Sequence, residues 1–419
     1  MKTPFASALL SLLAASTLSA QSTITLEQAR QAALANSPAT TDKQLYLDAG
    51  DLRAKSVSDA RLPQVKAVAQ STYQSEVTEF DLSAFGFPAI TISKDQYHAG
   101  FEVQQTIYEF GATHAQRDLA LTNAQAQAAQ ADVALLNVKR RTDQLYAGVL
   151  QQQAGLRILR LRAADIAAQL AQVSSAVRNG VSLRSNEELL KAEALATEQQ
   201  IITSATALAQ TVSALSILTA LPMDTTMTFV LPEVPAAKGM GTRPERTAFS
   251  LQQSSTSLQA DLVRKANLPH IAAFGNGYYG RPGFNFLYND FRTYGMVGLG
   301  INWNIAGYYT QGKKLKENAI QQKLIEDRER QFGLEQATDI DREEKEIAKL
   351  DRIAELDPGI VASKTFVCEA AASQLRNGVI TAQDYVIEQN AQDQAKLNME
   401  LHRIQAVMAR MDHQLTQGN

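Results

Sequence analysis

The sequence contains few of the residues that build disulfides, metal centres and nucleic-acid surfaces. Its 419 residues include a single cysteine, Cys368, so neither an intrachain disulfide nor a cysteine metal cluster can form. No two of the 5 histidines stand at helical i, i+3 or i, i+4 spacing, so no histidine zinc site is expected. The net charge of −3 shows no basic excess, and nucleic acid is therefore not an expected partner.

Catalytic patterns are also missing from the sequence. We find no nucleophile–base constellation, no metal cluster and no phosphate-binding loop. Gly275-Asn276-Gly277 and Gly298-Leu299-Gly300 are not dinucleotide loops, because no GxGxxG opens a helix there, and small residues in curved strands explain them. The sequence therefore predicts a protein that is not an enzyme and that has no cofactor and no metal.

Long apolar runs are scarce beyond the N-terminus. Residues 1–20 are typical of a secretory signal peptide, with one charge, Lys2, ahead of an apolar stretch. Cleavage is expected after Ala20, with cleavage after Ser19 as the alternative because Leu18 replaces the usual small residue. We expect that no later stretch offers the ~18 uncharged apolar residues of a membrane helix. This predicts an exported protein without a helical span.

What the sequence does contain is an apolar repeat of unusual length, in residues 111–177. Apolar side chains recur there in alternating steps of three and four, which is the period of a left-handed coiled coil. At ~1.5 Å per residue such a helix would extend for about 100 Å. We call this apolar stripe the seam, and its only polar members are Thr142 and Gln152. Its positions are Leu121, Ala124, Ala128, Ala131, Leu135, Val138, Thr142, Leu145, Val149, Gln152, Leu156, Leu159, Ala163, Ile166, Leu170, Val173 and Val177.

The period changes to two in the segments that precede this helix. Residues 64–79 carry small or apolar side chains at alternate positions, with mostly polar ones between them. Residues 96–108 do the same, with Phe101 and Val103 on one face and Glu102 and Gln104 on the other. Both segments are predicted to be strands, and each exceeds the ~9–11 residues with which a tilted strand crosses a bilayer.

The second half of the chain repeats this order. Residues 21–238 are expected to form a first repeat of a helix, strands 64–79 and 96–108, the long helix 111–177, a helix at 183–219 and a connector. Residues 239–419 would form the second, with a helix, strands at 269–280 and 291–305, a long helix at 308–376 and a helix at 381–415. An Arg-Asn-Gly sequence ends each long helix, and its glycine can supply the left-handed cap.

Four strands are too few to close a barrel, and open sheet edges are not tolerated in lipid. Several copies of the chain must therefore share one barrel, and the helices with alanine-rich seams must continue it. The sequence thus predicts an α+β membrane protein with an internal two-fold repeat, assembled as a hollow homo-oligomeric conduit.

A family resemblance rests on short motifs that recur in order over nearly the whole mature chain. They are Leu26-Glu27-Gln28-Ala29, Asn36-Ser37-Pro38, Arg61-Leu62-Pro63-Gln64-Val65, Arg243-Pro244-Glu245, Leu268-Pro269-His270-Ile271, the strand-to-helix junctions ending in Gly111 and Gly307, and the two Arg-Asn-Gly turns. In this order the sequence resembles the outer-membrane efflux protein family of the TolC type.

The resemblance implies a homotrimer in which each subunit gives four strands to one twelve-stranded β-barrel in the outer-membrane lipid of a Gram-negative bacterium. The helices would continue the barrel as a coiled-coil tunnel through the periplasm. Proteins of this family dock onto a periplasmic adaptor (membrane fusion) protein and an inner-membrane pump, in efflux or type I secretion systems. They export drugs, metals or proteins passively, and the resemblance does not identify the cargo.

The resemblance also implies two sets of functional residues. The adaptor-contact tips would be the helix turns, made of Arg178, Asn179, Gly180, Val181, Arg376, Asn377, Gly378 and Val379. The pore constriction would involve Asp384, which has the family's spacing from the second turn glycine. Glu388 stands next to the family's second acidic position, which is Ile387 here, and Asn186 is the first-half equivalent of Asp384. The alternative for Asp384 is a first-turn acid that favours the helix dipole.

A second hypothesis is a periplasmic coiled-coil structural or adaptor protein. It explains the long seam but leaves the four amphipathic strands without a purpose. Dependence of the purified protein on detergent would separate the two hypotheses.

Overall fold

The computed structural model describes residues 23–418, apart from 81–82, 87–89 and 235–238. The predicted signal peptide, residues 1–20, lies outside the described residues. The chain forms two compact units, which we describe separately. The first unit comprises residues 23–37, 137–234 and 340–415, and the second unit comprises residues 38–136, 239–339 and 416–418.

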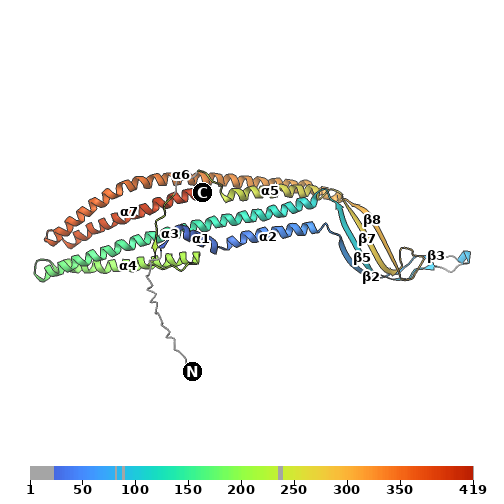
Figure 1. Ribbon diagram of the computed structural model, residues 1–419, viewed down its shortest axis with the longest axis horizontal. Coiled ribbons are helices and arrows are strands. Elements are labelled where there is room, and N and C mark those ends of the chain that lie inside the picture. Colours follow the sequence, from blue (N-terminus) through green and yellow to red (C-terminus); the bar gives the residue numbers. More distant parts are fainter. Residues whose placement is uncertain (1–22, 81–82, 87–89, 235–238, 419) are drawn as a thin grey trace, which may run out of the picture. The chain divides into compact units, whose positions relative to one another are not determined.

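The second unit contains a four-stranded antiparallel sheet (Figure 1). Its strands are β2 (Gln64–Tyr73), β5 (Asp95–Tyr108), β7 (His270–Arg281) and β8 (Arg292–Asn302), in the order β2-β5-β7-β8. The strand expected at 64–79 is therefore too long. Its pairing stops at Tyr73 opposite Asp95, where β5 begins, and the following residues form a separate ribbon of β3 (Glu79–Phe80) with β4 (Ile90–Thr91). Likewise β8 ends at Asn302, because a 3-10 turn at Ile305–Gly307 starts the next helix.

All four helices of the second unit connect to the same end of this sheet. Helix α2 (Pro38–Asp59) leads into β2 and α5 (Pro244–Lys265) leads into β7, whereas α3 (Ala112–Arg178) follows β5 and α6 (Tyr308–Arg376) follows β8. Because the strands are antiparallel, these four junctions lie together and the loops between strands lie at the opposite end. The packing of α2 on α3 is close, since a Cβ added at Gly50 would lie 2.2 Å from that of Ala124.

The first unit consists mainly of two helical hairpins. The later part of α3 turns back as α4 (Arg184–Thr219), and the later part of α6 turns back as α7 (Ala382–Gln417). Helix α1 (Leu26–Asn36) and the short parallel pair β1 (Thr23–Ile24) and β6 (Thr228–Phe229) pack beside them. The predicted α3 seam is confirmed, since none of its positions is exposed. Its polar member Thr142 is fully buried, and burial leaves its hydroxyl hydrogen-bonded, because the hydroxyl donates to the Val138 carbonyl at 2.9 Å.

Helix α4 corrects one expectation from the sequence. It contains an 18-residue window of mean hydropathy 1.6 with at most 2 charged residues, so by length and composition it could cross a membrane. The expectation that no later stretch would qualify is therefore wrong. In the single chain 17% of that window is buried, and α4 contributes Leu208, Val212 and Leu215 to the core of the first unit.

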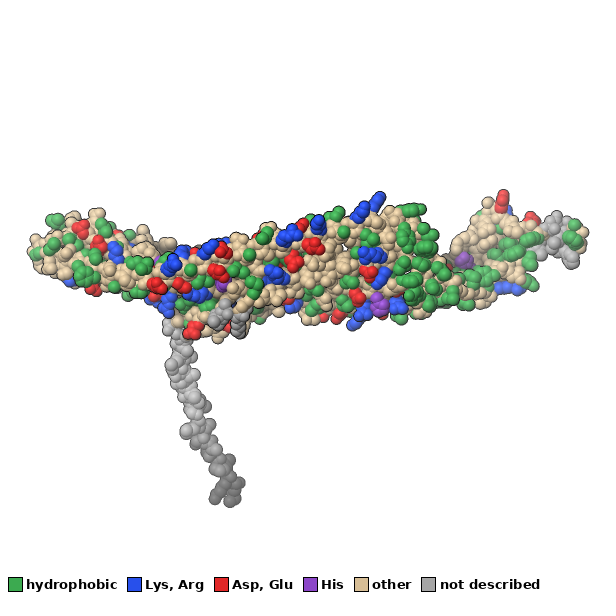
Figure 2. Space-filling view, turned by 90° about the horizontal axis from the view of Figure 1, so that it is seen from above, with side chains coloured by type: hydrophobic (Ala, Val, Ile, Leu, Met, Phe, Trp, Pro, Cys, Tyr) green, Lys and Arg blue, Asp and Glu red, His purple; other side chains and the backbone are tan. Residues whose placement is uncertain are grey.

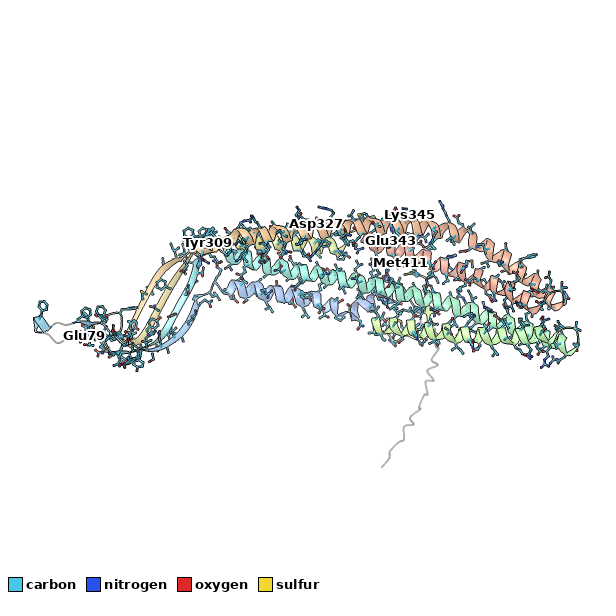
Figure 3. The ribbon with its side chains drawn as sticks, turned by 180° about the vertical axis from the view of Figure 1, so that it is seen from behind. Glu79, Tyr309, Asp327, Glu343, Lys345 and Met411 are labelled. Atoms are coloured by element: carbon cyan, nitrogen blue, oxygen red, sulfur yellow. The ribbon has the colours of Figure 1, made fainter. Side chains whose placement is uncertain are left out.

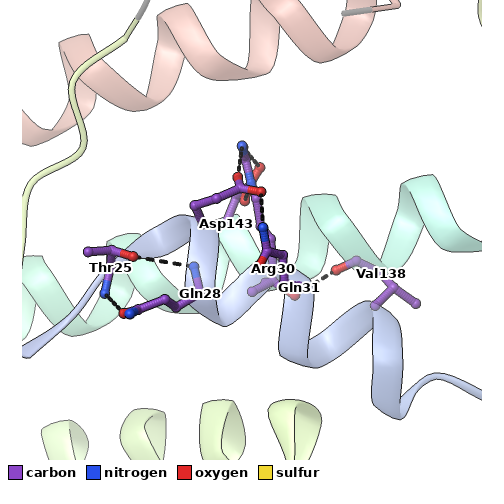
Figure 4. A network of polar contacts seen from close by, with 8 residues as sticks. Thr25, Gln28, Arg30, Gln31, Val138 and Asp143 are labelled. Carbon is purple, nitrogen blue, oxygen red and sulfur yellow. Dashed lines mark hydrogen bonds and ion pairs between the residues drawn. The ribbon is translucent and has the colours of Figure 1, made fainter.

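A buried ion pair fixes α1 to α3 (Figure 4). The Arg30 guanidinium donates two hydrogen bonds to the Asp143 carboxylate, from Nε to Oδ1 and from Nη2 to Oδ2, both at 2.6 Å. The side chains are 13% and 1% exposed. Burial and the charge of Arg30 lower the pKa of the neighbouring Lys139, which Asp143 opposes. Asp143 thus compensates positive charge that is largely shielded from water.

Tyr146, one turn further along α3, joins the short strands to the same core. Its side chain is fully buried, and its hydroxyl lies 2.9 Å from the Ile24 carbonyl and 2.8 Å from the Val230 carbonyl. The hydroxyl also accepts a hydrogen bond from the Val230 amide. Burial raises the pKa of Tyr146 to about 12, so the phenol remains protonated at physiological pH and can keep donating.

Removing Asp143 should destabilise the first unit far more than removing a surface partner. In Asp143→Ala the Arg30 charge loses its buried partner and retains the 66% exposed Glu27, 4.0 Å from its Nη1, so the cost should approach that of a broken buried pair, about 3–5 kcal/mol. The matched control is Asp132→Ala, whose partner Lys43 is 43% exposed, so its loss should cost about 0–1 kcal/mol. Denaturant unfolding of the two variants in detergent measures this difference. An equal loss of unfolding free energy in the two variants would mean that the Arg30–Asp143 pair stabilises the protein no more than an exposed ion pair does.

Candidate functional site

One face of the sheet is apolar and exposed. Residues that pair directly across antiparallel strands point to the same side, so the register assigns the faces. Phe101 pairs with Ala67 and with Gly277, and Gly275 pairs with Val103 and with Val297. The most exposed residues on this face are Val297 (86%), Leu299 (75%) and Ile301 (72%). Figure 2 shows hydrophobic side chains gathered over the sheet, whereas charged side chains are spread along the helices.

The opposite face is mostly polar, although it also carries Phe274 and Met296. Lys66 pairs with Glu102, Gln70 pairs with His98, and Asn276 stands opposite Glu102 on the next strand. Its polar groups also bond to one another, since the Tyr278 hydroxyl lies 2.5 Å from Glu102 Oε1. A sheet with one apolar face in contact with solvent and one hydrogen-bonded polar face is the pattern of a membrane barrel wall.

Exposed aromatic side chains flank the apolar face at both ends of the strands. At the end that joins the helices they are Tyr108, Phe110, Trp303, Tyr308 and Tyr309. At the loop end they are Tyr73, Phe80, Phe85, Phe284, Phe286, Tyr288 and Phe291. Figure 3 shows Tyr309 at the start of α6 beside the sheet and Glu79 at the loop end. Two aromatic girdles mark the two interfaces of a bilayer. Sequence reasoning missed them, although aromatic residues just outside each alternating run were a usable signal.

The two helix turns of the first unit share one geometry. Gly180 and Gly378 both have φ of +70°. The amide of Val181 donates to the Ala176 carbonyl at 2.8 Å, and the amide of Gly180 donates to the Val177 carbonyl at 3.1 Å. Val379 and Gly378 make the same two bonds to Gln374 and Leu375, at 2.9 Å and 3.1 Å. Both turns are therefore Schellman motifs, in which glycine tolerates the left-handed conformation.

All the residues predicted for these turns are exposed, from Arg178 to Val181 and from Arg376 to Val379. Val181 and Val379 are 75% and 70% exposed, and Leu183 beside them is 70% exposed. A Schellman turn usually packs this apolar residue on its own helix. Here the valines face outward at both turns, which suits a surface that another protein covers.

Asp384 caps the helix that follows the second turn. Its carboxylate Oδ2 accepts hydrogen bonds from the Thr381 amide at 2.9 Å and from the Thr381 hydroxyl at 2.7 Å. The Asp384 amide in turn donates to the Thr381 hydroxyl at 3.3 Å. These bonds to Thr381 lower the pKa of Asp384. The capping role weighed at the sequence level is therefore present, and Asp384 is also exposed.

Asn186, the first-half equivalent, has a different partner. Its side-chain Oδ1 accepts a hydrogen bond from the Ala382 amide at 3.1 Å, so it links the start of α4 to the start of α7. Among the described residues, the side chain of Asp384 bonds to Thr381 of its own turn, whereas Asn186 bridges the two hairpins. Glu388 lies one turn further along α7 and is partly exposed. The bond from Asn186 to α7 was not foreseen, because nothing local in the sequence signals it.

An apolar cluster holds the two hairpins together beneath these turns. Leu190 and Ala382 are fully buried in it, and Tyr385 is 3% exposed. Leu375 and Val173 join them from α6 and α3. The turns are thus displayed on a packed four-helix end.

Comparison with known proteins identifies the family. The family model described as outer membrane efflux protein matches residues 8–221. The chain belongs to the outer membrane efflux protein family. No curated protein sequence matches it.

Solved structures of outer-membrane channels share the fold of this family member. The outer membrane protein VceC of Vibrio cholerae superposes with a TM-score of 0.74 at 16% identity, over 93% of this chain and 96% of VceC. The CmeC outer membrane channel of Campylobacter jejuni superposes with a TM-score of 0.71 at 13% identity, over 94% of this chain and 86% of CmeC. The MtrE outer membrane channel of Neisseria gonorrhoeae superposes with a TM-score of 0.68 at 16% identity, over 94% of this chain and 89% of MtrE.

Removing the Thr381 cap should loosen the first turn of α7. In Thr381→Ala the loss is expected to be about 1 kcal/mol, so the amides of residues 382–385 should exchange with solvent roughly fivefold faster. Thr381→Ser retains the hydroxyl and is the matched control. The lowered pKa of Asp384 means that its ionised carboxylate stabilises the first turn of α7. This stabilisation is fully present above the ordinary carboxyl pKa and is lost as the pH falls through the lowered pKa. Protection of these amides should therefore also fall in strong acid. Unchanged exchange in Thr381→Ala would contradict the capping role.

Proposed function

We propose that this protein is the outer-membrane duct of an efflux or type I secretion system. The observation that carries the proposal is the exposed apolar face of the sheet between its two aromatic girdles. Monomeric soluble proteins rarely expose a contiguous apolar face such as this one, on which Val297, Leu299 and Ile301 are 86%, 75% and 72% exposed. In a lipid bilayer the same face is buried, and each residue on it gains the free energy of leaving water.

The sheet edges imply more than one copy. Among the described strands of this sheet, β2 and β8 each pair on one side only. Their free backbone groups would be unsatisfied in lipid, so β8 of one copy is expected to pair with β2 of the next. Three copies would close a twelve-stranded barrel with the polar face inside, as the family resemblance implies.

The helices supply the tunnel in this proposal. They leave the sheet at one end, so in the assembly they extend together from one rim of the barrel. Leu195, Ile202 and Ile217 on α4 are exposed at 69%, 59% and 75% in the single chain. Contacts between neighbouring copies would cover them. The internal repeat then gives the tunnel two similar hairpins per subunit.

The location follows from the same features. A signal peptide at residues 1–20 would send the chain across the inner membrane of a Gram-negative bacterium. The barrel would enter the outer membrane, and the helices would extend into the periplasm. Export through such a duct is passive and needs no catalytic residue. The energy would come from an inner-membrane pump.

The exposed turns are the proposed docking surface for a periplasmic adaptor protein. Both present an outward valine between arginine, asparagine and glycine, so an adaptor would meet the same pattern twice in each subunit. The constriction would lie just inside these turns. Asp384 and Glu388 would supply acidic groups there, and Asn186 would hold the two hairpins together through Ala382.

A periplasmic structural or adaptor protein remains the alternative. It would share the coiled-coil hairpins, but it would leave the apolar sheet face in water. Detergent dependence therefore separates the two, because a periplasmic protein without a lipid anchor stays soluble.

The mass of the purified particle tests the proposal directly. The protein extracted from outer membranes should have, after subtraction of detergent, three times the mass of one mature chain. Sedimentation or mass photometry measures this. A detergent-independent particle with the mass of one chain would overturn both the barrel and the trimer.

Ion selectivity tests the constriction. A ring of three Asp384 carboxylates attracts cations, so single-channel recordings at low salt should show cation preference. Asp384→Asn removes the charge but retains an oxygen acceptor for Thr381, and it should reduce this preference with the cap preserved. Asp384→Ala should remove both. Glu388→Gln is the comparison on the next turn. If Asp384→Asn changes nothing and Glu388→Gln does, the ring belongs to Glu388, and if neither matters the constriction lies elsewhere.

A further inference from the structure

A groove in the first unit has no role in the proposed duct. It has a volume of about 750 Å³ and lies among α3, α4 and α7. Apolar side chains line much of it, including Ile158 and Leu159 from α3 and Leu397 and Leu401 from α7. Charged and amide side chains line the rest, including Arg162, Glu193, Asn390 and Asp393.

Two of the three charges in the groove compensate each other. Arg162 on α3 donates from Nη2 to Oε1 of Glu193 on α4, and their side chains are 12% and 23% exposed. This pair stays within one hairpin, and the buried Nε of Arg162 has no hydrogen-bond partner. Asp393 on α7 makes no ion pair with the other described lining residues, although the Arg162 charge acts on it.

Asp393 is buried without enough donors. The residue is 8% exposed, and its Oδ2 has no hydrogen-bond partner. Burial raises its pKa to about 6, with a contribution from Asp165, while Lys396 and Arg162 oppose the rise. At neutral pH the carboxylate is therefore mostly charged. A buried charge in this state is costly unless a donor reaches it.

A second hydrogen-bond acceptor in the groove, Oδ1 of Asn390, is also buried and unsatisfied. Residues 390 and 393 lie three apart on α7, so their side chains share one face of the helix. Two unsatisfied acceptors on one wall call for a group with several N–H donors and a positive charge. The leucines on the adjoining surface call for an apolar body.

We propose that this groove binds an organic ammonium ion that carries an apolar group. The ammonium would donate to Asp393 and Asn390, and the apolar group would lie on Leu159, Leu397 and Leu401. An ammonium has three donors and suits these acceptors. A metal ion suits them less, because in the described chain no group of three or more His, Cys, Asp or Glu side chains is placed to hold one.

The proposal goes beyond conduction and does not depend on it. A ligand in the groove would contact α7 and the α3–α4 hairpin at once, so its binding energy would favour the arrangement in which both are packed. Loss of ligand binding would leave barrel assembly and ion conduction intact, and failure of the trimer would not by itself remove the groove.

Fluorescence titration with dansylcadaverine, a primary ammonium with an aromatic body, tests the proposal on the full-length protein in detergent. Binding should be saturable in the wild type. Asp393→Asn should weaken it by about tenfold or more, as expected for loss of a charged hydrogen bond. Asp165→Asn removes a nearby charge from an exposed position and should change binding less than about twofold. The N-acetylated probe, which lacks the positive charge, should show no saturable binding.

A second variant keeps the test decisive if Asp393→Asn does not fold. A Cβ at Gly155 would lie 4.0 Å from Leu397 Cδ1, so Gly155→Val narrows the groove without a steric clash at Cβ and should weaken the probe. Equal binding of the probe by wild type, Asp393→Asn and Gly155→Val would overturn the proposal. So would saturable binding of the N-acetylated probe. Absence of saturable wild-type binding would also overturn it, and a changed oligomeric mass in Asp393→Asn would then indicate that a cationic side chain of a second copy fills the groove.

Discussion

The need of every backbone N–H and C=O group for a partner is the constraint on which this structure depends. Within the sheet, β5 and β7 satisfy theirs on both sides, and β2 and β8 on one side only. Water can satisfy such edges in a soluble protein, but hydrocarbon cannot. An apolar sheet face and two open edges are therefore compatible only if other strands complete the sheet. The need for strands from other copies follows from this conflict rather than from any single residue, and the family resemblance adds the proposed number of three.

Helices and strands with a regular alternation of apolar and polar residues could be predicted from the sequence. Contacts between particular residues far apart in the chain could not. The 3.5-residue seam of α3 and the alternation in β5 are visible because each side chain's surroundings depend on its position along one element. The end of β2 was misplaced, because a strand stops where its partner stops, and β5 begins at Asp95. The Arg30–Asp143 pair and the bond from Asn186 to Ala382 join residues far apart in the chain, so no local pattern announces them.

The two turns show how one backbone motif can serve different purposes. Gly180 and Gly378 have the same φ of +70°, and the same two backbone bonds close each turn. Asn186 and Asp384 then occupy equivalent places after them. The aspartate accepts two bonds from Thr381 and caps its own helix, but Leu183 stands at the corresponding cap of α4 and offers no side-chain acceptor. Residue 186 is therefore free to reach the amide of Ala382.

That difference has a consequence for the proposed constriction. If both positions were aspartate, two carboxylates would be close to the start of α7, and their repulsion would oppose packing of the hairpins. Asparagine keeps the acceptor for Ala382 and removes the charge. In the proposed constriction the acidic character would then rest on Asp384 and Glu388, while Asn186 supplies the bond to Ala382. Of two equivalent positions, one can thus carry the charge of the proposed constriction while the other makes the contact that positions it.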